Sequence, residues 1–508
     1  MQFIYENLSV LAIGAAVSLI TWSFGGTHGD LLVKIVPWAM LFVVEIMLAF
    51  PQRREGESLY DARSRMFEKM KRDPLVWTAL GLILFLAIPF VNNGLCPNCD
   101  RALIRTGIDP APPLKLLPGC VNRLDHLNVF LWFFAALITV VGVRHSLCGR
   151  GKRMLVKFLV WNGFALAILG FVQVAADAEG PLWTVPQGVT RMYDFFSVWG
   201  YPNMAGEFFT MMFGFAAVAW RSAHIENRRE ENELGNAGNK SNHAAFWYDN
   251  LYLIPALTFF VAAVNTLSRA AIVLVSALAL LFFAHTFMSF SRRMSRADRV
   301  RKGVITFVTA CVITFFCIIS LPEDVQHEVD SLNTESVLNR VSGKGEYHSH
   351  VAWELFKDHP LYGCGGWGYR HLCFTKMTDK EIRHAQIKGG ANVHNDWLQF
   401  LTEHGILGFG TMVIICWFLY SPILFGWKKL FNDVRFAHSK QLPAKPVRLF
   451  VLPAPIFFLL LTVLAAFIHG FCDCTMRSPA VLIHFFIAFA VMEGYMPRHA
   501  RPHLKDKH

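Results

Sequence analysis

The chain has 508 residues, of which 54% are hydrophobic and only 17% are charged, and it contains 45 Phe and 14 Trp. This composition excludes a single soluble domain, because one soluble core cannot bury so many apolar side chains. The formal net charge of +11 does not indicate nucleic-acid binding, since the basic residues are scattered along the chain without aromatic interleaving. The sequence therefore predicts an all-α polytopic membrane protein embedded in a lipid bilayer.

Twelve apolar segments are long enough for transmembrane helices, each of which needs about 20 apolar residues. The first is not expected to be a cleaved signal peptide, because MQFIYEN contains no Lys or Arg and no small-residue cleavage site follows it. The predicted segments are residues 8–24, 31–50, 75–91, 126–143, 155–176, 203–220, 249–266, 268–290, 304–321, 406–425, 448–470 and 479–495.

These segments divide the chain into three regions. Residues 1–321 hold nine helices, residues 322–405 form one large loop, and residues 406–508 hold three helices and a tail. A further long loop, residues 92–125, contains three cysteines. The length and aromatic content of the large loop favour a small functional subdomain, in which SHVAWELFKDHP predicts a short helix that stops at Pro360.

The distribution of Lys and Arg predicts the orientation, because short cytoplasmic loops retain these residues. Five loops on one side and the C-terminal tail hold 31 of the 48 Lys and Arg, whereas the short loops on the other side hold 7. We therefore expect both termini to be cytoplasmic and both long loops to lie on the external side.

Seven of the 11 cysteines fall on this external side, where disulfides are expected. Seven is an odd number, so at least one must stay free or pair elsewhere. We expect a bridge between two of them, Cys364 and Cys373. Zinc is an alternative for the CPNC stretch, although no fourth ligand follows at an expected spacing. The seven are Cys96, Cys99, Cys120, Cys364, Cys373, Cys472 and Cys474.

Two polar sites lie beside the middle helices on the external side. Arg269 is in NTLSRAAIV, between two apolar segments, where a cation needs an anion or water unless it snorkels to lipid headgroups. Arg191 is the only Lys or Arg in the loop before the sixth helix, and Asn203 follows Pro202 at the start of that helix. Asn203 has the alternative role of an N-cap.

A third polar site is the stretch GGANVHNDWLQFLTEHGILG, residues 389–408. Asp396 and Gln399 have the spacing of a capping box for a helix that begins at Trp397. His394 would lie just before this helix, whose dipole disfavours the imidazolium, so the neutral ring could accept a proton. The alternative is an ordinary surface histidine, since the chain has 20.

A neutral base and two arginines suit one class of reaction. Arginine binds phosphate bidentately and keeps its charge, so it can stabilise a pyrophosphate leaving group. The sequence contains no G-x-x-x-x-G-K-[ST] motif, and GCGGWG at 363–368 is interpreted as a tight glycine turn because no strand precedes it. These features predict glycosyl transfer from a lipid pyrophosphate at the membrane surface.

Four stretches resemble the O-antigen ligase and O-antigen polymerase family of bacterial integral membrane proteins. They are YPNMAGEFF, NTLSRAAIVLV, VAWELFKDHPLYGCGGWGYR and VHNDWLQFLTEHGILGFG. The resemblance implies an enzyme of the inner membrane that transfers a glycan from undecaprenyl pyrophosphate to an acceptor hydroxyl on the periplasmic side. It further implies an inverting displacement without a metal or other cofactor.

The resemblance also implies roles for individual residues. His394 would be the catalytic histidine, and Arg269 would bind the pyrophosphate. Apart from the resemblance, we predict Arg191, Asn203 and Asn395 as further substrate-binding residues.

The chain departs from the family at one position. Family members often carry an arginine four residues before the tryptophan of the large loop, where this chain has Ser349 before Trp353. Arg340 is expected to supply the missing cation. Alternatively, the neighbouring His348 and His350 could bind a metal ion.

The acceptor stays open between lipid A core, another glycan repeat and a protein hydroxyl. We favour lipid A core, the acceptor of an O-antigen ligase, over the polymerase and protein O-oligosaccharyltransferase alternatives. Two other classes compete, a twelve-helix secondary transporter and a structural scaffold. Ionisable residues within the spans are few, chiefly Lys34, Glu45 and Lys157, and the polar clusters gather at one interface, which favours surface chemistry over transport.

Overall fold

A computed structural model describes residues 7–27, 29–54, 56–92, 114, 116–185, 195–233, 250–291, 347–378, 381–382, 392–439 and 452–496. Over these residues the chain is helical and forms no strand, which confirms the all-α prediction. The chain divides into two compact units, which are described separately. Unit 1 comprises residues 1–159, 340–457 and 470–508, and unit 2 comprises residues 160–339 and 458–469.

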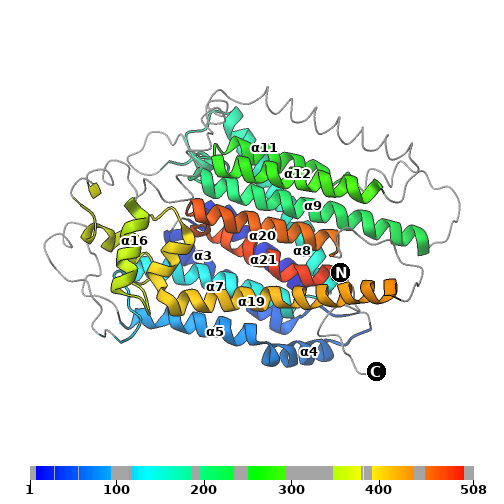
Figure 1. Cartoon of the computed structure of the whole chain (residues 1–508), viewed down its shortest axis with the longest axis horizontal. Helices are drawn as coiled ribbons and strands as arrows, with labels where there is room; N and C mark the ends of the chain where they lie inside the picture. Colours follow the sequence, from blue (N-terminus) through cyan, green and yellow to red (C-terminus); the bar gives the residue numbers. More distant parts are fainter. Residues whose placement is uncertain are drawn as a thin grey trace. The chain divides into compact units, whose positions relative to one another are not determined.

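Unit 1 is built around two buried helices that pack together, α7 (Arg123–His145) and α21 (Pro479–Tyr495). Almost every residue of α21 is buried, as expected for a helix that is apolar around its whole circumference. The other apolar helices of the unit are α2 (Leu8–Trp22), α3 (Gly29–Ala49), α5 (Pro74–Ala87) and α19 (Asp396–Ser439) (Figure 1).

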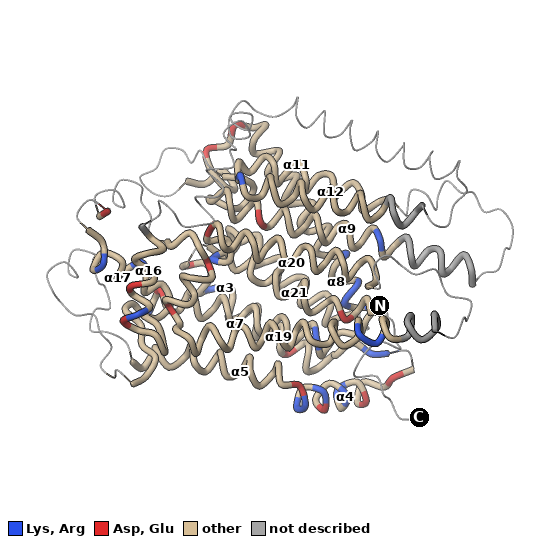
Figure 2. The backbone as a smooth tube through the Cα atoms, viewed as in Figure 1, with Lys and Arg blue, Asp and Glu red and all other residues tan. Residues whose placement is uncertain are grey.

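The helix α4 (Leu59–Arg72) turns sharply away from α5, at an angle of 68°. Asp73 lies at the bend, and its carboxylate accepts a hydrogen bond from Leu75 N at 3.0 Å. Pro74 opens α5 because it lacks an N–H and disfavours helical backbone in the residue before it. Charged residues of both signs follow one another along α4, whereas α5 carries none (Figure 2).

Unit 2 contains α9 (Pro202–Glu233), α11 (Leu253–Asn265) and α12 (Arg269–Ser291), which pack side by side (Figure 1). Small residues allow this approach: a Cβ at Gly206 of α9 would lie 2.6 Å from the Cβ of Ala271. Two long helices, α8 (Gly149–Ala175) and α20 (Ala454–Cys472), contribute residues to both units.

Eleven of the twelve predicted segments overlap a described helix, and the twelfth, residues 304–321, lies outside the described residues. Within the described ranges, six helices can cross a membrane by length and composition, or up to seven if α4 and α5 form one bent span. The helices α2, α11 and α21 are apolar but shorter, with 10–17 residues. The six are α3, α7, α8, α12, α19 and α20.

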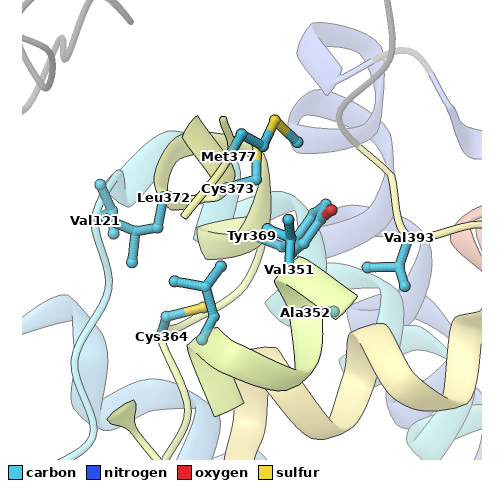
Figure 3. Close-up of a cluster of buried hydrophobic side chains, with 10 residues drawn as sticks. Val121, Val351, Ala352, Cys364, Tyr369, Leu372, Cys373, Met377 and Val393 are labelled. Atoms are coloured by element: carbon cyan, nitrogen blue, oxygen red, sulfur yellow. The ribbon is translucent and has the colours of Figure 1, made fainter. Parts of the chain in front are cut away.

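The large loop contains α16 (Tyr347–Asp358), the short helix expected before Pro360, followed by α17 (Gly368–Leu372) and a 3-10 turn, Cys373–Thr375. These elements share a small apolar core, which Figure 3 shows in close-up. We call this core the loop cluster. It consists of Val121, Val351, Ala352, Leu355, Cys364, Tyr369, Leu372, Cys373, Met377 and Val393.

Candidate functional site

His394 lies in unit 1, just before α19, and the backbone next to it is fixed by packing and by a hydrogen bond. Its neighbour Val393 is fully buried in the loop cluster (Figure 3), and Val393 N donates to Gln399 Oε1 at 3.1 Å. His394 itself has φ = 53°, a left-handed conformation that residues with a Cβ rarely adopt. The surrounding contacts therefore stabilise this strained backbone conformation, which fixes the direction of the His394 side chain.

The helix begins where the sequence predicts, but its capping residue is different. Asn395 Oδ1 accepts the hydrogen bond from Leu398 N at 3.0 Å, so Asn395 is the side-chain cap. The capping-box assignment of Asp396 was wrong, because its carboxylate is engaged elsewhere: Asp396 Oδ2 accepts from Met476 N at 2.7 Å.

The imidazole of His394 meets a buried carboxylate. His394 Nδ1 lies 3.3 Å from Asp473 Oδ1, while the side chain of Asp473 is only 3% exposed and that of His394 is 33% exposed. The same oxygen of Asp473 accepts from the backbone N–H of Cys474 at 2.7 Å. This arrangement orients the ring, favours the tautomer with its proton on Nδ1 and stabilises the imidazolium that a proton transfer would form.

The thiol of Cys474 completes this group. Its sulfur donates to Asp473 Oδ1 at 3.3 Å, and the side chain is 2% exposed. Burial, together with the nearby carboxylates of Asp473 and Asp396, raises the pKa of the Cys474 thiol well above its usual value. Cys474 is therefore a hydrogen-bond donor at neutral pH, and not a nucleophile.

A buried arginine lies in the same turn between α20 and α21. Arg477 Nη1 forms an ion pair with Glu403 Oε2 at 2.9 Å, and its Nε lies 3.8 Å from Asp396 Oδ1. The guanidinium also lies over the ring of Trp367, 4.9 Å from its centroid. Gln399 Nε2 donates to the other oxygen of Glu403 at 2.9 Å. This network joins the turn to the first part of α19.

Arg477→Met is expected to destabilise the protein by roughly 3–5 kcal/mol, because Glu403 and Asp396 would stay buried without their cation. The thermal unfolding midpoint of the purified protein in detergent measures this loss. The double variant Arg477→Met/Glu403→Gln is the control and should recover part of the stability. An unchanged midpoint for the single variant would show that the pair contributes little.

A small open pocket adjoins this network within unit 1. Asp396 and Arg477 form its charged part. The rest is mainly apolar, with an aromatic lining of Trp132, Phe133, Trp397, Phe400, Phe485 and Phe486. An apolar pocket with a charged end suits a ligand that has a hydrocarbon part and a polar group.

A break in α19 brings the glycine-rich loop next to this region. Gly405 has non-helical backbone, at the point where the sequence predicts the membrane segment to start. The backbone groups released by the break pair with the loop: Gly365 N donates to Glu403 O at 2.8 Å, and Ile406 N donates to Pro360 O at 2.8 Å. A helix interrupted inside a membrane protein needs such partners.

The same loop confirms the glycine-turn interpretation of GCGGWG. Gly363 and Gly365 have φ of 72° and 83°, and a Cβ at Gly365 would lie 2.5 Å from Gly119 O. Only glycine fits these positions. The expected bridge between Cys364 and Cys373 is wrong, because Cys364 is a free thiol buried in the loop cluster.

The other cysteine and histidine predictions have mixed outcomes. Cys120 and Cys474 are also free thiols, while Cys96 and Cys99 lie outside the described residues. His348 and His350 are not among the described side chains that converge on a possible metal position. Tyr369 Oη lies 2.9 Å from His348 Nδ1, and His350 faces Glu354 at 3.9 Å.

In unit 2, Arg269 is the first residue of α12, directly after the hairpin turn that the sequence predicts. Ser268 Oγ accepts from Ala271 N at 3.3 Å and Leu267 has φ = 61°, so the turn is tight. Asn203 is the second residue of α9, and its Nδ2 donates to Tyr201 Oη at 3.2 Å. Two other predicted site residues, Arg191 and Arg340, lie outside the described residues.

Unit 2 also contains a buried polar pair that the sequence analysis missed. His469 Nδ1 of α20 lies 2.6 Å from Glu207 Oε2 of α9, and both side chains are fully buried. Lys34 and Glu45, which the sequence analysis considered, are exposed on α3. Ionisable groups buried among apolar helices are expensive unless paired, so this contact ties α9 to α20.

Sequence reasoning also missed Asp473, Arg477 and Glu403. A signal was available in FCDCTMRSPA, where an acid and an arginine occupy a short connection between two apolar segments on the side assigned to His394. Their pairing with α19 was not visible, since Asp473 is 79 residues from His394 in sequence.

Comparison with known proteins supports the resemblance. No curated protein sequence matches the chain significantly. Residues 254–413 match the family model described as O-antigen ligase, and this range includes Arg269, His394 and Asn395. Over these 160 of its 508 residues, the chain is similar to the O-antigen ligase family.

Proposed function

We propose that the protein is an O-antigen ligase that transfers a glycan from undecaprenyl pyrophosphate to a hydroxyl of lipid A core. The observation that carries this proposal is the contact between His394 and the buried carboxylate of Asp473. His394 lies just before α19 and inside the range matched by the family model. A histidine oriented by a buried carboxylate is the arrangement that activates a hydroxyl by accepting its proton.

In the proposed reaction, His394 Nε2 takes the proton from the acceptor hydroxyl while Nδ1 keeps its contact with Asp473. The acceptor oxygen attacks the anomeric carbon of the glycan, and the bond from that carbon to the phosphate oxygen breaks. The electron pair leaves with undecaprenyl pyrophosphate. One displacement of this kind inverts the anomeric configuration.

Cationic and amide side chains would hold the charged leaving group and the sugars. Arginine stabilises the charge that develops on a departing pyrophosphate. We assign this role to Arg269, the first residue of α12, where the helix N-terminus also favours an anion. The further proposed substrate-binding residues are Arg191, Asn203, Arg340 and Asn395.

We place the active site on the periplasmic face of the inner membrane, with both termini in the cytoplasm. The Lys and Arg distribution supports this orientation, because it assigns the loop before α19 to the external side. An undecaprenyl carrier would present its glycan on that face.

An in vitro transfer assay tests the proposal. The purified protein is placed in vesicles and supplied with an undecaprenyl pyrophosphate-linked glycan as donor and with either lipid A core or a free glycan repeat as acceptor. We expect a new glycosidic bond to lipid A core and one released undecaprenyl pyrophosphate for each glycan transferred, by mass spectrometry. Growth of the repeat instead would assign a polymerase. Solute movement across the vesicle without a new glycosidic bond would overturn the enzyme assignment in favour of a transporter.

A further inference from the structure

Three ligand atoms of different chemistry converge beside His394. They are His394 Nδ1, the carboxylate of Asp473 and Cys474 Sγ, and all lie within 4.8 Å of one another. Among the described residues these form the group of His, Cys and acidic side chains that could hold a metal ion. The proposed transfer reaction uses His394 and Asp473, but it gives the sulfur no task.

Two of the three distances in this group already fit a tetrahedral ion. Zn²⁺ takes nitrogen and oxygen ligands at about 2.0–2.2 Å and sulfur at about 2.3 Å, which separates neighbouring ligand atoms by about 3.3–3.6 Å. Asp473 Oδ1 lies 3.3 Å from His394 Nδ1 and 3.3 Å from Cys474 Sγ. Small side-chain rotations would therefore complete a three-ligand site, with water as the fourth ligand on the side where His394 is 33% exposed.

The charges in the group fit a divalent ion as well. A carboxylate, a thiolate and a neutral imidazole together carry two negative charges, so a divalent cation makes the buried complex neutral. A metal deprotonates a coordinating thiol outright, which overcomes the preference of the buried Cys474 for its protonated form. The set of one S, one N and one O ligand favours a borderline-soft ion over Mg²⁺ or Ca²⁺.

We propose that His394, Asp473 and Cys474 form an inhibitory site for Zn²⁺. The ion would occupy the lone pair of His394 Nδ1, so the single ring proton must move to Nε2. A ring with its proton on Nε2 cannot accept the proton of an acceptor hydroxyl there. Binding releases one proton, from the Cys474 thiol, and a chelator restores the active tautomer.

The binding of Zn²⁺ at this site does not depend on the proposed function. The inhibition rests on the proposed function, because it requires glycan transfer by His394. The purified full-length protein in detergent, titrated with Co²⁺ as a spectroscopic probe, is expected to bind one ion with a thiolate-to-cobalt charge-transfer band. Zn²⁺ should displace this band. Loss of an outer-sphere partner already weakens metal affinity by about 10–100-fold, so loss of a ligand in Cys474→Ser should weaken it by at least about 100-fold.

Cys472→Ser is the matched control, because Cys472 lies two residues from Cys474, at the end of α20, and is not one of the three proposed ligands. This variant should keep the band. His394→Gln gives a second test if Cys474→Ser does not fold, since it removes the nitrogen ligand and leaves the sulfur. A band that persists in either ligand variant, or that is absent from the unmodified protein, overturns the site.

Inhibition is measured in the vesicle assay as the ratio of rates with and without Zn²⁺ for each variant. The unmodified protein should lose at least about 90% of its rate when the ion is at ten times its dissociation constant, by simple mass action, and a chelator should restore the rate. An unchanged rate at full cobalt-site occupancy would overturn the inhibition alone. If no transfer occurs under any condition, the cobalt titration still decides the site, and the failure belongs to the proposed function.

Discussion

The variant His394→Gln is expected to lower the turnover number of glycan transfer by about 10²–10⁴-fold, the range that a positioned general base contributes. Glutamine is polar and of similar length, but it cannot take a proton at neutral pH. The Michaelis constant for the lipid-linked donor should change little, because the proposed donor contacts come from other residues. Initial rates in vesicles over a range of donor concentrations give both constants.

His350→Gln is the matched control. His350 is exposed on α16, with a side chain that is 70% exposed, and the same substitution there should leave the rate unchanged. If His394→Gln retains the rate of the unmodified protein while folding normally, His394 is not the base. The proposed mechanism would then fail at its central step.

Asp473→Asn is expected to lower the turnover number by up to about 10⁴-fold, the loss seen when the equivalent change leaves a catalytic histidine in the wrong tautomer. An asparagine can turn its NH₂ group toward His394 Nδ1, which puts the ring proton on Nε2. The site would keep its shape and lose its proton acceptor. Asp473 acts here through His394, so it is a positioning residue.

Two measurements separate this role from a structural one. The turnover number should fall while the Michaelis constant for the donor stays near its original value, and the unfolding midpoint should fall far less than for Arg477→Met. In addition, the losses in turnover number caused by Asp473→Asn and by His394→Gln should not add in the double variant, because the two residues act as one unit. Fully additive losses in the double variant would show that the two residues act independently, which contradicts the positioning role of Asp473.

Asp358→Asn is the control for the change of acid to amide. Asp358 pairs with Lys376 at 2.7 Å on the surface of the loop region, where its side chain is 44% exposed. An exposed pair of this kind contributes about 0–1 kcal/mol, so neither rate nor stability should change appreciably.

The sequence by itself determined the local features of this protein. Apolar runs predicted eleven segments that overlap described helices, and SHVAWELFKDHP predicted α16 with its stop before Pro360. The polar run before Trp397 located the start of α19 within one residue, and GCGGWG at 363–368 predicted a tight turn. These features depend on backbone preferences and periodicity, which are encoded in neighbouring residues.

Only the tertiary structure decided which polar groups meet. It assigned the cap to Asn395, because packing turned Asp396 toward the connection between α20 and α21. It paired His394 with Asp473 and Glu403 with Arg477, groups 79 and 74 residues apart in the chain. It also left Cys364 as a free thiol, without the expected bridge to Cys373. Such pairings depend on how helix ends are brought together by packing of apolar faces, and no local pattern of residues records that arrangement.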